Sequence, residues 1–110
     1  MPAQEATFAQ ELARLVDTHL EYESFNVTSL AQAVGLSRVQ LYRRVCRAMG
    51  ETPASYIRRR RLERAARLLR EEGLTVTETV YEVGLNNLSY FAKVFQRQYG
   101  VLPSVYAARS

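Results

Sequence analysis

The sequence predicts an all-α fold of about seven helices, in which two helix-turn-helix subdomains are joined by a long central helix. The first observation is that residues 27–56 and 76–106 carry one pattern twice, at an offset of 49 that becomes 50 after the glycine turn. A fixed period of this length indicates a repeated supersecondary unit, here helix, glycine turn and helix. The second observation is that no stretch alternates apolar and polar residues over the length of a strand. The matching pairs are Val27 and Val76, Val34 and Val83, Gly35 and Gly84, Leu36 and Leu85, Leu41 and Phe91, Val45 and Phe95, Gly50 and Gly100, Pro53 and Pro103, and Tyr56 and Tyr106.

The first subdomain is expected to contain three helices. Apolar residues recur at helical spacing over 5–22 and predict the first of them. Asn26 is a suitable N-cap for a second helix, which ends at the turn glycine Gly35 because glycine adopts the left-handed conformation without strain. Ser37 is then the N-cap of a third helix, over 38–49.

A long central helix is expected to follow. Pro53 stands at the first helical position after Thr52, and the helix runs to about residue 72. Arg61 lies one turn from apolar residues on either side, so we expect it to pair with a carboxylate at a helix–helix junction. The other arginines of this helix fill the opposite face. The apolar stripe consists of Ile57, Leu62, Ala65, Ala66, Leu68 and Leu69.

The second subdomain repeats the first. Thr75 and Glu78 have the spacing of a capping box, which predicts a helix up to about Val83. After the glycine turn, a helix over 88–99 is expected, and Pro103 begins a short last helix. The expected parts of this single domain, 1–110, are a first subdomain over 5–50, the connecting helix over 53–72 and a second subdomain over 75–109.

The composition excludes several classes of protein. One cysteine, Cys46, rules out an internal disulfide and a cysteine-based metal cluster, and one histidine, His19, disfavours a zinc site or a catalytic triad. Paired carboxylates and a phosphate-cradling loop are also missing, so we expect no enzyme activity, no cofactor and no metal. Without a long apolar run or a signal peptide, the domain is expected to be cytoplasmic and to make no membrane contact.

The charge of the chain is unevenly distributed. Eleven arginines and two glutamates give residues 38–70 a net charge of +9, whereas residues 1–37 carry −4 and residues 71–110 carry −1. Confinement of basic charge to the middle of the chain favours one anion-binding surface. A solvated helix face, or a genome rich in arginine codons, would explain the arginines equally well.

The second helix of each unit is expected to bury one face and expose the other. Residues at the N-terminal end of such a helix are the ones that reach base edges in the major groove of DNA. Val39 and Leu88 are unusual choices for a solvated surface, and each can touch a thymine methyl group. Alternatively, they pack on a neighbouring helix or are simply exposed. The outward residues are Val39, Tyr42, Arg43, Leu88, Ser89, Tyr90 and Lys93.

The second unit reads VYEVGLNNLSYFAKVFQRQYGVLPSVY and fits the frame G-[FL]-x-x-x-S-Y-F-x-x-x-F-x-x-x-[FY]-G-x-x-P-x-x-[YF]. With this frame the chain resembles the DNA-binding domain of the AraC/XylS transcriptional regulators. LAQAVGLSRVQLYRRV in the first unit and YIRRRRLERAARLL in the connecting helix add to the similarity, which spans roughly residues 8–108. The mixture of motifs is most similar to output domains at the C-terminus of hybrid two-component sensor kinase–response regulators.

This resemblance implies sequence-specific binding of double-stranded DNA for transcription regulation. The helices over about 38–49 and 88–99 would enter successive segments of the major groove, and the outward residues given above would contact bases. RNA polymerase is an implied partner, and sensing and dimerisation domains would lie outside this sequence. The residues implied in phosphate contact are Ser37, Arg38, Arg44, Asn86 and Asn87. Apart from the resemblance, the arginines of the central helix form a weaker set of candidates for phosphate contact, because most of such a run is usually solvated: Arg58, Arg59, Arg60, Arg61, Arg64 and Arg67.

The sequence departs from the family pattern in the second unit. Thr79 and Val80 replace an apolar residue followed by alanine, Leu85 stands where phenylalanine is usual, and Leu102 cannot cap the last helix as a serine would. An alternative function also stays open at this point. The chain would then be a helical interaction module whose arginine face binds an acidic partner protein.

Overall fold

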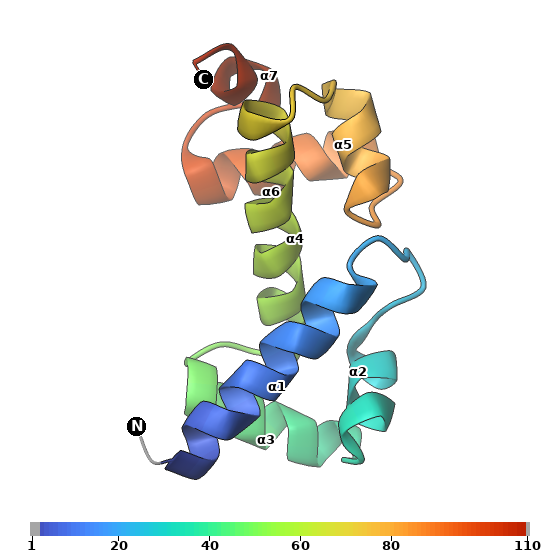
Figure 1. Cartoon of the computed structure of the whole chain (residues 1–110), viewed down its shortest axis with the longest axis vertical. Coiled ribbons are helices and arrows are strands. Elements are labelled where there is room, and N and C mark those ends of the chain that lie inside the picture. The colour runs from blue at the N-terminus through green and yellow to red at the C-terminus, as the bar shows by residue number, and fades with distance from the viewer. Residues whose placement is uncertain (1–2, 110) are drawn as a thin grey trace.

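The computed structural model describes residues 3–109, which contain seven α-helices and no strand (Figure 1). The all-α prediction is therefore confirmed. The first helix was expected to run to residue 22, but it ends at His19, because the carbonyl groups of the following residues turn toward Arg61 instead of continuing the helix. The helices are α1 Ala3–His19, α2 Val27–Val34, α3 Arg38–Met49, α4 Pro53–Glu71, α5 Val76–Glu82, α6 Leu88–Tyr99 and α7 Pro103–Ala108.

Side-chain caps fix where most of these helices begin. The side-chain oxygens of Asn26, Ser37, Thr52 and Thr75 each accept a hydrogen bond from the backbone N–H three residues later, at 3.0–3.1 Å. Asn87 caps α6 in the same way, at 2.8 Å. Each bond satisfies one of the backbone donors that the first turn of a helix leaves without a partner.

Two hydrophobic cores lie along the molecule, and α4 contributes to both. The first core combines α1, α2 and α3 with Tyr56 and Ile57 at the start of α4. The second combines α5 and α6 with the rest of α4, from Leu62 to Leu69, and Tyr106 of α7 packs at its edge. All six residues of the predicted apolar stripe are buried, which confirms that the stripe is the inner face of α4.

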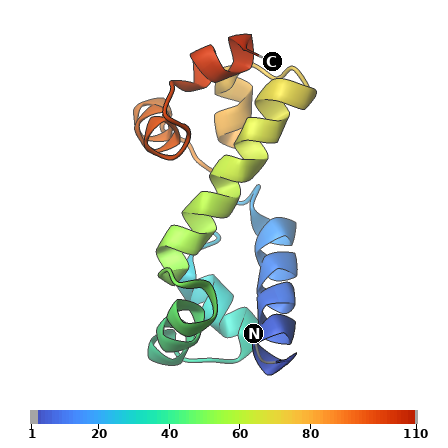
Figure 2. The same ribbon diagram turned by 90° about the vertical axis from the view of Figure 1, so that its left-hand side faces the viewer.

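The molecule is elongated, with extents of 41 × 28 × 21 Å. Figure 2 shows α3 and α6 along one edge, seen nearly end-on, with α4 between the two halves and α1 at the opposite edge. In Figure 1 the two helices run in the same direction, with their N-terminal ends on the same side of the molecule. Among the described residues, no helix has the length and apolar character needed to cross a membrane.

Candidate nucleic-acid interface

The outer face of α3 carries apolar and basic side chains together. Leu41 and Val45 are buried in the first core with residues of α1 and α2, so the opposite face of the helix is turned toward solvent. Val39 is 60% exposed and Tyr42 is 53% exposed, although both are large apolar or aromatic residues. Arg43 is exposed beside them. The alternative that Val39 packs on a neighbouring helix is therefore wrong.

The outer face of α6 repeats this arrangement. Its buried residues belong to the second core, whereas Leu88 is 47% exposed and Tyr90 is 43% exposed. Ser89 and Lys93 are exposed on the same helix. All seven residues predicted to face outward from the two helices are exposed, and the two helices that carry them lie along one edge of the molecule (Figure 2).

A hollow beside α3 widens the exposed surface. Its volume is about 600 Å³, and it lies between the outer face of α3, the start of α2 and the start of α4. Both guanidinium-bearing and apolar side chains line it, so it can contact a charged backbone and a methyl group together. The lining residues are Val27, Arg38, Val39, Tyr42, Arg43, Thr52, Pro53 and Ala54.

The residues implied in phosphate contact divide into two groups. Ser37 and Asn87 hold the N-termini of α3 and α6 as caps, so they place the free backbone N–H groups of those turns at the exposed edge. Arg38 is exposed at the start of α3. In contrast, the Asn86 amide donates to the carboxylate of Glu23 at 2.7 Å, and the Arg44 guanidinium lies 4.2 Å from the centre of the Phe8 ring.

Two arginines of α4, Arg59 and Arg60, are held in ion pairs. Arg59 binds Glu51 at 2.7 Å and Glu63 at 3.1 Å, and the hydrogen bond to Glu51 is the main cause that raises the pKa of Arg59. Arg60 pairs with Asp17 of α1 at 2.5 Å and lies 3.8 Å from Glu63. The basic surface is therefore smaller than the charge of residues 38–70 indicates.

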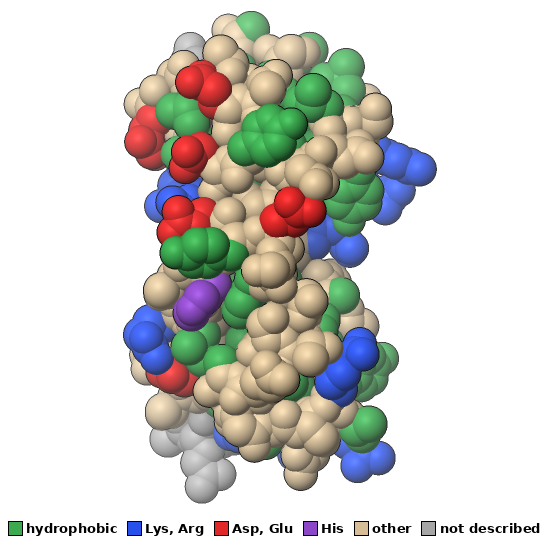
Figure 3. Space-filling view, turned by 90° about the vertical axis from the view of Figure 1, so that its right-hand side faces the viewer, with side chains coloured by type: hydrophobic (Ala, Val, Ile, Leu, Met, Phe, Trp, Pro, Cys, Tyr) green, Lys and Arg blue, Asp and Glu red, His purple; other side chains and the backbone are tan. Residues whose placement is uncertain are grey.

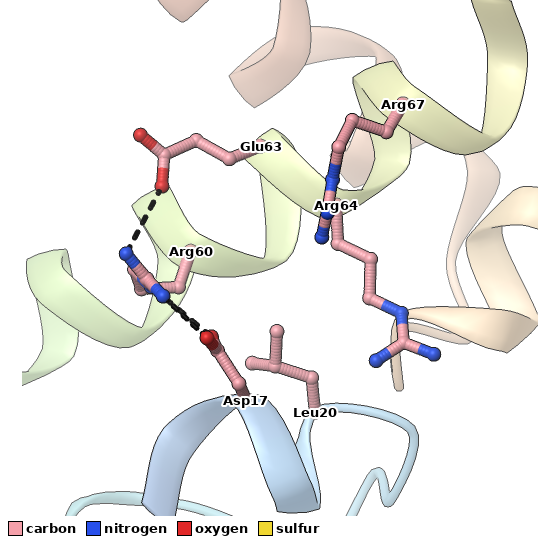
Figure 4. A pocket seen from close by; sticks show the side chains of 6 residues that line it. All are labelled: Asp17, Leu20, Arg60, Glu63, Arg64 and Arg67. Atoms are coloured by element: carbon pink, nitrogen blue, oxygen red, sulfur yellow. Dashed lines mark hydrogen bonds and ion pairs between the residues drawn. The ribbon is translucent and has the colours of Figure 1, made fainter. Parts of the chain in front are cut away.

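Arg64 and Arg67 lie apart from these pairs. They line a cavity of about 430 Å³ between α1 and α4, together with Asp17, Leu20, Arg60 and Glu63. In Figure 4 the dashed contacts belong to Arg60, and the guanidinium groups of Arg64 and Arg67 have none with the residues drawn. Because α1 lies at the edge opposite α3 and α6, this cavity is not part of the surface that the two helices form.

The prediction for Arg61 was half right. The residue is buried at a junction, but it pairs with backbone carbonyl groups and not with a carboxylate. Burial lowers the pKa of Arg61 from its ordinary value. The sequence contains no signal for this contact, because a carbonyl acceptor is common to every residue type. The buried environment of the side chain was predictable, whereas its partners were not.

Acidic side chains are unevenly distributed on the face shown in Figure 3, whereas basic side chains occur on both sides of it. Figure 3 shows blue basic and green apolar side chains along its right-hand edge, the side on which α3 and α6 lie, and most of the red acidic groups to the left. A mixed basic and apolar strip that presents two helix N-termini is suited to nucleic acid. Basic side chains and helix N-termini can bind phosphates, and apolar side chains and bidentate arginines can contact base edges.

Comparison with known proteins identifies the family. The helix-turn-helix domain family matches residues 30–109. The transcriptional regulator MtrA of Neisseria gonorrhoeae is 33% identical over 84 residues, which are 76% of this chain and 28% of MtrA. The chain belongs to the AraC/XylS family of DNA-binding transcription regulators. This confirms the resemblance seen in the sequence, and the members of that family are not enzymes.

Solved AraC-type structures share the whole fold. The DNA-binding domain of AdpA, solved in complex with a target DNA, superposes with a TM-score of 0.84 at 28% identity, covering 91% of this chain and 89% of that chain. The C-terminal domain of AraT, a response regulator from Geobacillus stearothermophilus, also gives 0.84, at 25% identity, covering 92% and 84%.

The chain spans only a small part of its curated relatives. It is 32% identical over 96 residues to histidine kinase P4 of Formosa agariphila, and this match covers 87% of the chain but 7% of the kinase. The similarity therefore concerns one AraC-type domain within a much longer protein. Kinase activity is not part of what the two sequences share.

Proposed function

We propose that this AraC-type domain reads double-stranded DNA with α3 and α6 in successive segments of the major groove. The observation that carries the proposal is that both helices expose large apolar and basic side chains along one edge while their inner faces close the two cores. Helices that run in the same direction present both N-terminal ends to the same side of the duplex. The proposed base-reading residues are Val39, Tyr42, Arg43, Leu88, Ser89, Tyr90 and Lys93.

The chemistry of these side chains suggests individual roles. Arg43 can form a bidentate contact with O6 and N7 of guanine, and Val39 and Leu88 can pack on thymine methyl groups. The proposed phosphate contacts position the domain without reading sequence. Arg44 and Asn86 would have to leave Phe8 and Glu23, at least in part, before they reach a phosphate. The proposed phosphate contacts are Ser37, Arg38, Arg44, Asn86 and Asn87.

We further propose the division of labour within the whole protein. Residues 5–50 and 75–109 would each read one part of the site, and the helix over 53–72 would hold them together. The greater length of the relatives supports sensing and dimerisation domains outside this sequence, with RNA polymerase as the partner through which transcription is regulated. This domain would carry out no chemical reaction.

Selection of DNA from a random pool tests the two-helix proposal. Two unlike helices predict an asymmetric site with two short constrained patches, about 10 bp apart. Changing Val39 and Arg43 to alanine should relax one patch, and changing Leu88 and Lys93 should relax the other. A site with a single constrained patch would show that one of the two units only clamps the backbone.

A further inference from the structure

The side chain of Arg61 joins the two helix-turn-helix units. It projects from the middle of α4, and only 5% of the residue is exposed. Its Nη1 donates to the Leu20 carbonyl at 2.7 Å and to the Val83 carbonyl at 2.5 Å. Its Nη2 donates to the carbonyls of Tyr22 at 3.3 Å and Phe25 at 2.9 Å. One guanidinium thus binds the α1–α2 connection and the end of α5 together.

These bonds are costly to lose. Arginine keeps its charge at neutral pH, and hydrogen bonds from a charged donor are stronger than neutral ones. A buried carbonyl that loses its donor retains the full cost of its desolvation. The planar fork of five donors is also specific to arginine, so the single ammonium group of lysine cannot bind all four carbonyls in the same geometry.

The glycine of the second turn, Gly84, lies so close to this guanidinium that no side chain fits there. Gly84 has a φ of +77°, and a Cβ atom placed on it would lie within 3.0 Å of both Arg61 Nη1 and the Leu20 carbonyl oxygen. Gly35, its counterpart in the first unit, has a similar φ of +72°, but a Cβ there meets no heavy atom within 4 Å. The two glycines therefore have a similar positive φ, but only at Gly84 does the missing side chain also allow Arg61 and the Leu20 carbonyl to lie against the turn.

A second polar contact crosses the same junction at the surface. The amide of Asn86, in the turn that follows Gly84, donates to the Glu23 carboxylate at 2.7 Å. Glu23 belongs to the connection whose carbonyls Arg61 binds. The two turns are thus held together by a buried guanidinium and by an exposed pair beside it.

We propose that Arg61 fixes the separation and rotation of the two units, and so sets the number of base pairs that the domain requires between the two patches it reads. This inference rests on the proposed function, since it assumes that α3 and α6 each read bases. One additional base pair moves a patch by about 3.4 Å along the duplex and rotates it by about 34°. A rigid junction cannot follow that displacement, whereas a loosened junction can.

The experiment uses duplexes that carry both selected patches with 0, 1 or 2 bp added or removed between them. Each added or removed pair should weaken wild-type binding about 10-fold or more, comparable to one mismatched base pair. In Arg61→Lys and Arg61→Met, each added or removed base pair should weaken binding less than about 3-fold. Both variants should still bind a duplex that carries a single patch. Circular dichroism and urea titration select the temperature at which each variant is folded.

Gly84→Ala and Gly35→Ala form a matched pair for this test. Both place a side chain at a similar positive φ, but only Gly84→Ala brings a Cβ atom against the Arg61 guanidinium and against the Leu20 carbonyl that it binds. Gly84→Ala should flatten the spacing preference, and Gly35→Ala should keep it while losing stability.

The outcomes separate the two proposals. An unchanged spacing preference in the folded Arg61 variants and in Gly84→Ala would overturn the role of Arg61. If the wild type itself has one constrained patch and tolerates any spacing, the two-helix proposal fails before Arg61 is tested. Should Arg61→Met be unfolded at every temperature, the spacing preferences of Arg61→Lys and Gly84→Ala decide the matter.

Discussion

The guanidinium carbon of Arg44 lies 4.2 Å from the centre of the Phe8 ring, which fastens α3 to α1. Its neighbour Arg43 faces away from α1 and is exposed beside Tyr42. In the unbound domain, two consecutive arginines of one helix therefore differ: Arg44 packs on an aromatic ring and reaches a phosphate only by leaving Phe8, whereas Arg43 is already available to a base. Only the substitution of Arg43 should therefore affect DNA binding without affecting folding.

Arg44→Ala should lower the free energy of unfolding by about 0.5–1 kcal/mol, the range for a partly exposed cation–π contact. Arg44→Lys should lose less, because an ammonium group also interacts with the ring face. Urea unfolding of Arg44→Ala, Phe8→Leu and the double variant measures the coupling between the two side chains. Strictly additive effects would show that the contact contributes nothing to stability.

Arg43→Ala should weaken specific DNA binding by about 5- to 150-fold, which corresponds to the roughly 1–3 kcal/mol of a bidentate arginine–guanine contact. The preference at one base pair should also become flat. Because Arg43 is exposed, the circular dichroism spectrum and the urea midpoint should stay the same. The measurement is a binding titration on the selected site and on its single-base variants.

Arg67→Ala is the matched control for Arg43→Ala. Arg67 is an exposed arginine beside the cavity between α1 and α4, away from α3 and α6. Arg59 would serve less well, since its ion pairs with Glu51 and Glu63 would also be lost. Any effect of Arg67→Ala should be equal for every DNA sequence. Full discrimination at every position in Arg43→Ala would show that the reading face of α3 is wrongly assigned.

Binding should weaken steeply with salt. If about four phosphates are neutralised, raising salt from about 50 to 200 mM should reduce affinity about 100-fold, because bound counterions are released from DNA. Arg38→Ala should reduce the slope of log affinity against log salt by about one. Affinity that does not change over this range would instead favour an acidic protein as the partner.

Leu102→Ser should stabilise the domain by up to about 1 kcal/mol. Leu102 occupies the N-cap position of α7 in an extended conformation, makes no side-chain cap hydrogen bond and is 42% exposed. The equivalent residue of the first unit, Thr52, accepts a hydrogen bond from the Ser55 N–H at 3.1 Å. Thr52→Ala should accordingly destabilise by about 0.5–2 kcal/mol in the same urea titration. Equal urea midpoints for Leu102→Ser and the wild type would mean that this cap contributes nothing.

Local features of the structure were predictable because their causes are local. A cap such as Ser37 acts on a backbone group three residues away, and the apolar stripe of α4 repeats at the period of the helix. These features also determined which residues of α3 and α6 face outward. The identity of the exposed surface thus follows from short-range pattern alone.

Contacts between distant parts of the chain were not predictable in the same way. Arg61 binds carbonyls 22 to 41 residues away, and the overextended prediction for α1 failed for the same reason. Arg60 pairs with Asp17, which lies 43 residues earlier in the chain, so the charge of Arg60 is neutralised within the protein. Net charge in a sequence counts such paired groups and unpaired ones alike.

The sharing of α4 by both cores has a consequence for engineering new regulators. A chimera that crosses over within α4 would set Ile57 from one parent and Leu62 from another into a single helix, and would leave one core with foreign packing. A crossover at Gly73 keeps α4 whole, but the grafted half must still accept the hydrogen bond that Arg61 donates to the Val83 carbonyl. New binding preferences are therefore better introduced by exchanging the exposed residues of α3 and α6 on an unbroken scaffold.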